Sequence, residues 1–160
     1  LTRKNDAPLD FDLSSVTAQS RDNPVWYVQY AHARCNSLSR MIASQMPDLD
    51  ISYPSLKVAK FELLKEKPEI DLIKLMASWP RLIEASAIAK EPHRIAFYLN
   101  DLASAFHSLW TQGKENPSLR FMIEDDPELT RVRVALVSAL QMVIASGLDL
   151  LGIEPLQEMH

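Results

Sequence analysis

Prolines mark where helices begin in this chain. Pro24, Pro92 and Pro127 each precede a stretch with the apolar spacing of a helix. Proline has a fixed φ angle and no amide hydrogen, so it fits the first turn of a helix better than its interior. Asn23, immediately before the first of these prolines, is typical of an N-cap residue. These positions therefore predict the starts of three long helices.

Further breaks complete an all-helical pattern. The segment PDLDISYP, the pair Lys67-Pro68 and the loop TQGKENPSLRFMIED interrupt the helical periodicity. With 3 glycines in 160 residues, the chain has little room for the turns of a sheet. We therefore expect an all-α helical bundle. Its helices are predicted over residues 23–46, 56–67, 69–90 (kinked or broken near Trp79-Pro80), 91–110 and 126–152.

The last of these helices differs from the others in composition. Its sequence VRVALVSALQMVIASGLDLL is apolar nearly all round. A helix of this kind is usually central in a soluble bundle. We expect it to form the core.

The first helix carries two stripes of residues at about 100° per residue. One stripe is small and apolar and should be buried; it contains Val28, Ala31, Cys35, Leu38 and Ile42. The second lies roughly 90° away and should sit at the edge of the core; it contains Tyr27, Tyr30, Arg34 and Met41.

The residues of the second stripe have an ordinary structural interpretation. Tyrosine is common at the rim of a core, and an arginine there is usually solvated or ion-paired. His32 on the opposite flank fits a structural histidine. Phe106 and Trp110, four residues apart, could simply be core residues of their helix. From the residues alone, these side chains could be core packing or a surface that recognises a partner.

Composition excludes several classes of function. A net charge of −4 argues against general nucleic-acid binding, DNA included, but not against recognition of a few unpaired bases by stacking. The single cysteine, Cys35, excludes an internal disulfide and cysteine-rich zinc sites, and it favours a reducing, cytoplasmic setting. No metal site is expected, because the four histidines are scattered (His32, His93, His107 and His160).

Catalytic and membrane signatures are also missing. The sequence has no Gly-rich phosphate loop, no GxSxG motif and no local set of nucleophile, base and orienting group. No apolar run approaches the roughly 18 residues needed to span a membrane. The first residue is not methionine, so we expect a fragment of a longer chain.

Four stretches resemble one family. Residues 22–34, DNPVWYVQYAHAR, resemble the motif DNPVYYVQYAHAR that opens the C-terminal domain of bacterial arginyl-tRNA synthetases. DFDL at residues 10–13, EPHRIAFYLNDLASAFHSLW at 91–110 and GLDLLGIEPLQEM at 147–159 resemble three further motifs of that domain, in the same order. The resemblance implies the all-α anticodon-binding fold of class I synthetases, called DALR, over residues 23–159. Residues 1–22 would be the linker from the catalytic domain.

The resemblance also implies a function. The parent enzyme would attach arginine to its tRNA with ATP and Mg, both bound by a catalytic domain that these residues do not contain. This fragment should then have no ligase activity and no cofactor. It should bind the anticodon stem-loop of arginine tRNA, chiefly through the central cytosine, as a monomer. The alternative is a protein–protein interaction module that derives from this fold and no longer binds RNA, which the acidic balance favours.

The residues that the family uses on the anticodon can be carried over one at a time. Tyr27, Tyr30 and Arg34 match residues that stack on or flank loop bases. Phe106 and Trp110 match an aromatic pair in the later helix. Met159 matches a C-terminal methionine whose carboxylate lies near the anticodon, although His160 follows it here. Trp26 replaces a tyrosine or phenylalanine and should pack.

Overall fold

The computed structural model describes residues 23–159, and in this part of the chain it contains helices and no strand. This confirms the predicted all-α fold. The predicted linker at 1–22 and His160 lie outside the described residues. The elements are α2 (Pro24–Gln45), α3 (Tyr53–Lys57), η1 (Phe61–Leu63), α4 (Lys67–Ala77), α5 (Trp79–Ala89), α6 (His93–Glu115), η2 (Pro117–Leu119) and α7 (Pro127–Leu150), where η denotes a 3-10 helix.

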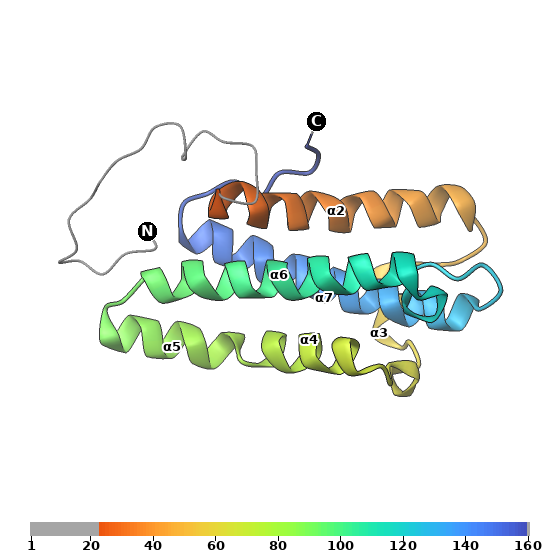
Figure 1. The fold of residues 1–160 in the computed structure, drawn as a ribbon, viewed down its shortest axis with the longest axis horizontal. Helices are drawn as coiled ribbons and strands as arrows, with labels where there is room; N and C mark the ends of the chain where they lie inside the picture. Colours follow the sequence, from red (N-terminus) through yellow and green to blue (C-terminus); the bar gives the residue numbers. More distant parts are fainter. Residues whose placement is uncertain (1–22, 160) are drawn as a thin grey trace.

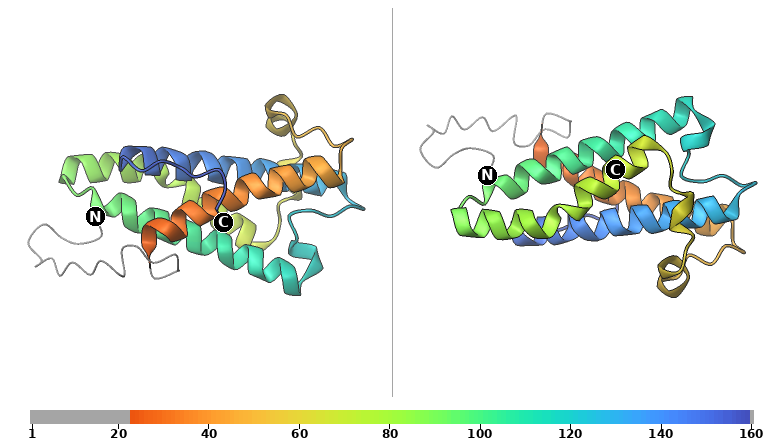
Figure 2. Two further views of the ribbon diagram at one scale, coloured as in Figure 1. Left: turned by 90° about the horizontal axis from the view of Figure 1, so that it is seen from above. Right: turned by 90° about the horizontal axis from the view of Figure 1, so that it is seen from below.

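The long helices pack side by side, with α6 in the middle (Figure 1). Helix α6 contacts α2 on one side, α4 and α5 on another, and α7 behind it. Helix α2 also packs along α7. Figure 2 shows the same bundle from two further sides, with α3 and η1 projecting at one end. The interface between α2 and α6 is the part of the fold that matters for the site.

The starts predicted for the three long helices are confirmed, since α2, α6 and α7 begin at Pro24, His93 and Pro127. The Asn23 side chain accepts hydrogen bonds from the amides of Val25 (3.1 Å) and Trp26 (3.3 Å). The Asp126 side chain accepts one from Leu129 N at 3.0 Å, at the start of α7. Each cap gives an acceptor to amides that have no partner within the first turn.

The region between residues 47 and 68 was predicted wrongly. A single helix over 56–67 was expected, but the structure has the short α3 and the separate η1. Pro54 lies in the first turn of α3, and Pro68 in the first turn of α4, which begins at Lys67. Both prolines start helices where breaks were expected from the sequence.

The interruption predicted near Trp79-Pro80 as a kink or a break is a break, because Ser78 separates α4 from α5. One other boundary differs from the prediction. Helix α6 continues beyond residue 110 to Glu115. Its extra turn brings Gly113 and Lys114 beside the segment that leads into α7.

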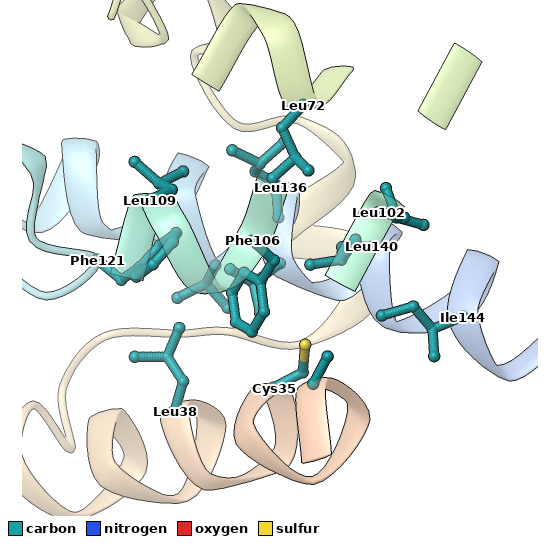
Figure 3. Packing of buried hydrophobic residues seen from close by; sticks show 14 of the residues in the cluster. Cys35, Leu38, Leu72, Leu102, Phe106, Leu109, Phe121, Leu136, Leu140 and Ile144 are labelled. Carbon is teal, nitrogen blue, oxygen red and sulfur yellow. The ribbon is translucent and has the colours of Figure 1, made fainter. Parts of the chain in front are cut away.

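The core is built on α7, as its composition indicates. Leu136, Leu140 and Ile144 pack with Phe106 of α6 and Cys35 of α2 (Figure 3). The expectation that no apolar stretch is long enough to span a membrane is corrected here: within the described residues α7 is the one helix long and apolar enough to do so, and 56% of its most apolar window is buried inside the bundle. Burial in the core accounts for this composition. The apolar stripe predicted for α2 is buried as expected.

A buried ion pair ties α4 to α7. Arg133 Nε donates to Glu69 Oε1 at 2.7 Å, and the two side chains are 3% and 2% exposed. The other carboxylate oxygen of Glu69 accepts from Glu66 N (3.1 Å), and Arg133 Nη1 donates to the carbonyl of Arg120 at 2.7 Å. Because both charges have several hydrogen-bond partners, the cost of burying them is offset.

The buried thiol of Cys35 gives a test of this core. Burial raises the pKa of the Cys35 thiol from 9.0 to about 12. The unfolded chain therefore releases this proton at a lower pH than the folded chain does, so the thiol lowers the free energy of unfolding as the pH rises from 9 to 12. We expect wild type to lose more stability over this interval than Cys35→Ala, as measured by urea denaturation. Equal losses in the two proteins would contradict the burial of this thiol.

Candidate functional site

A cavity of about 420 Å³ opens where α2, α6 and the C-terminal segment meet. It brings together four of the six residues predicted for the site: Tyr30, Arg34, Trp110 and Met159. The rest of its lining is Ala33, Ser37, Leu38, Arg40, Met41 and Glu158. Residues that are distant in sequence thus form one continuous surface.

Arg34 is at the centre of this surface. Its guanidinium Nη2 donates to the hydroxyl of Tyr30, one helical turn earlier, at 2.5 Å. The guanidinium carbon lies 4.5 Å from the centre of the Tyr30 ring and 4.9 Å from that of Trp110. Both distances are within the range of cation–π contacts. The arginine therefore holds an aromatic ring from each of two helices.

His107 of α6 contacts both Arg34 and the backbone of Tyr27 on α2. Its Nδ1 accepts from Arg34 Nη1 at 3.0 Å, and its Nε2 lies 3.4 Å from the carbonyl oxygen of Tyr27. Because a guanidinium only donates and a carbonyl only accepts, these two contacts suit the tautomer with its hydrogen on Nε2. The ring also stacks on Tyr30, with centroids 5.3 Å apart and planes 25° apart.

This role of His107 was not predicted from the sequence. The residue was considered only as a metal ligand and set aside. One signal was available: His107 precedes Trp110 by three residues, and such residues share a helix face. The partner of His107 on the other helix is 73 residues away, and spacing within one helix gives no information about it.

Two predicted site residues do not line the cavity. Phe106 is completely buried, with its ring 5.7 Å from that of Phe121 and 5.9 Å from that of Trp110. Figure 3 shows it pointing from α6 towards α2, beside Cys35. Phe106 therefore packs in the core here, and its assignment to the anticodon site stays a prediction. Tyr27 packs against the core, with its ring 4.6 Å from that of His107.

Trp26 extends the aromatic cluster along α2. Its ring stacks on Tyr30 with centroids 5.1 Å apart and an angle of 17° between planes. It packs, as expected from the sequence. Tyr30 thus lies between Trp26 and His107, which restricts its ring to one orientation.

The C-terminal segment after α7 returns across α2 and carries Met159 to the cavity (Figure 2, left). Gln29 Nε2 donates to the carbonyl of Glu154 at 3.0 Å, and His32 Nδ1 donates to that of Leu156 at 2.8 Å. Further along, Arg40 pairs with Glu158 at 3.3 Å. His32 is 2% exposed, which confirms the structural role predicted for it.

These residues together can hold a flat aromatic ligand that carries negative charge. The cavity offers the rings of Tyr30 and Trp110, and Arg34 supplies positive charge, whereas Arg40 is paired with Glu158. Among residues 23–159, no group of three or more His, Cys, Asp or Glu side chains could hold a metal ion. The rings and the guanidinium of this surface favour binding by stacking and charge.

Known proteins resemble this chain over its whole length. It is 55% identical over 160 residues to an arginine–tRNA ligase from Beijerinckia indica and 51% identical over 161 residues to one from Rhodospirillum rubrum. All of this chain is covered in both comparisons, but only 27% of each relative. The chain thus spans about a quarter of the length of these relatives.

The fold has a counterpart among solved structures. A Campylobacter jejuni structure that carries the name arginyl-tRNA synthetase superposes with a TM-score of 0.78 over 99% of this chain and 31% of that one, at 23% identity. This likeness supports the fold. The sequence model of one protein family, the DALR anticodon binding domain, matches residues 28–159. This range is most of the chain and includes every residue that lines the cavity. The chain therefore belongs to the DALR anticodon-binding domain family.

Proposed function

We propose that this chain binds the anticodon loop of arginine tRNA and positions that tRNA for ATP-dependent arginylation by a catalytic domain elsewhere in the same enzyme. The single observation that carries the proposal is the cavity in which Tyr30, Arg34 and Trp110 meet. The names of the curated relatives support the choice of arginine tRNA. The protein would act as a monomer, because one copy of the chain would form the site. It would act in the cytoplasm.

The chemistry of the cavity suits an unpaired base. Anticodon bases are unstacked and can be splayed onto aromatic side chains. Each such stacking contact is worth about 1–3 kcal/mol, so a few contacts suffice without a strongly basic groove. This fits a chain with a net charge of −4. Arg34 would add contacts to the phosphates or to base edges.

ATP would bind in the catalytic domain and not here. A phosphate-binding loop needs several closely spaced glycines before a helix. The glycines of this chain, Gly113, Gly147 and Gly152, are too far apart to form one. We therefore expect no ATP binding and no ligase activity from the 160-residue chain alone.

The main test is binding of the chain to a labelled hairpin with the arginine anticodon loop, at low salt. We expect Tyr30→Ala and Trp110→Ala each to raise Kd roughly tenfold, because each removes an aromatic ring from the cavity wall and a ring that positions Arg34. Tyr53→Ala is the matched control: Tyr53 is 71% exposed on α3, outside the cavity. A second hairpin with the central cytosine replaced should bind more weakly than the first.

The same measurement separates the alternative function. If wild type is folded by circular dichroism but binds neither hairpin, the chain is better explained as a protein interaction module. If both hairpins bind equally and Trp110→Ala has no effect, any binding is nonspecific and the cavity is not the site.

His107 gives a separate prediction, as a residue that positions Arg34. His107→Phe keeps an aromatic ring but removes the acceptor at Nδ1, and we expect it to raise Kd for the hairpin about tenfold. His107→Asn should recover part of the loss, since its side-chain oxygen can accept from Arg34.

A double variant distinguishes positioning from general damage. If His107 acts through Arg34, then His107→Phe should add little to the effect of Arg34→Met. Fully additive effects on Kd would contradict this role. Circular dichroism of each variant serves as the check on folding.

A further inference from the structure

A second cavity, of about 380 Å³, adjoins the first. The two share Leu38, Met41 and Trp110 in their linings. The second is completed by Gly113 and Lys114 at the end of α6, and by Arg120, Phe121 and Met122 in the segment before α7. Trp110 is thus the one aromatic side chain that lines both cavities.

The walls of this cavity are mainly apolar, with positive charge at the rim. Phe121 is buried and its ring lies 5.5 Å from that of Trp110. Lys114 and Arg120 are exposed, and no carboxylate within residues 23–159 forms an ion pair with either of them. An apolar pocket beside two cations without ion pairs suits a ligand that is both aromatic and anionic.

The backbone holds these walls in place. At Gly113 an added Cβ would lie 3.0 Å from the carbonyl oxygen of Leu119, so α6 and the following segment touch at this point. Arg120 Nε donates to the carbonyl of Gly113 at 3.2 Å. The carbonyl of Arg120 is bound in turn by buried Arg133, which Glu69 fixes. The cavity is therefore formed before any ligand arrives.

We infer that the second cavity binds a second unpaired base of the same RNA loop, next to the base in the first cavity. Trp110 would contact both bases, and Lys114 and Arg120 would lie near the phosphates. The inference rests on the proposed function. Two observations select a base over an apolar side chain of a protein partner: the cavity continues the first one, and its rim is positively charged.

The test fills the second cavity and leaves the first open. Met122 lines the second cavity and not the first, so Met122→Trp should fill the second cavity alone. The matched control is Met142→Trp, because Met142 is 66% exposed on α7 and lines neither cavity. Both are measured with hairpins in which each loop base in turn is replaced by an abasic nucleotide. Wild type should lose about tenfold in affinity at two neighbouring positions. Met122→Trp should abolish the loss at one position only, and Met142→Trp at neither.

A surface substitution tests the rim independently of packing. Lys114→Gln should weaken binding of every hairpin and reduce the slope of log Kd against log salt by about 0.7 to 1. Lys74→Gln, on an exposed position of α4, should leave the slope unchanged.

The outcomes separate this inference from the proposed function. If Trp110→Ala weakens binding but Met122→Trp leaves the abasic profile of wild type unchanged, the second cavity holds no base and only this inference fails. If Met122→Trp does not fold, an unchanged salt slope in Lys114→Gln overturns the inference by itself. If wild type binds no hairpin, both proposals fail.

Discussion

The partly buried guanidinium of Arg34 is the interaction on which the site depends. An arginine at a helix–helix interface needs hydrogen-bond acceptors, and this one finds them in the Tyr30 hydroxyl and His107 Nδ1. These two hydrogen bonds hold rings from α2 and α6 in fixed positions around the guanidinium. The close packing of α2 and α6 on α7 holds the two helices at the required separation. Core packing and site geometry are therefore linked through a single side chain.

The buried pair Glu69–Arg133 has a comparable role for the second cavity, through the backbone of Arg120. It holds α4 to α7 and also anchors the segment that carries Phe121 and Met122. Hydrogen bonds within the protein thus fix both cavities before a ligand binds. Such preorganisation lowers the entropy lost on binding, which matters for a chain whose net charge of −4 does not attract RNA.

Sequence patterns predicted features within single helices and missed the contacts between residues far apart in the sequence. Proline positions gave the starts of α2 and α7, and helical periodicity placed Tyr30 and Arg34 together at the edge of the core. The contact of His107 with Arg34 and that of His32 with Leu156 join residues 73 and 124 positions apart, which no helical periodicity describes. Spacing also put Phe106 and Trp110 on one face but could not tell which ring lies deeper. The short helices between residues 47 and 68 were predicted wrongly, because Pro54 and Pro68 fit a helix start as well as a break.

The most direct test is to map the RNA contact on the chain itself. Backbone and indole NH chemical shifts of the 160-residue chain would be followed while the arginine anticodon hairpin is added. If the loop binds at the first cavity, the largest changes are expected at Tyr30, Arg34, the indole NH of Trp110 and residues 156–159, where α2, α6 and the C-terminal segment meet. Largest changes on α5, around the exposed Ile88, would contradict this site and place the RNA on a different face.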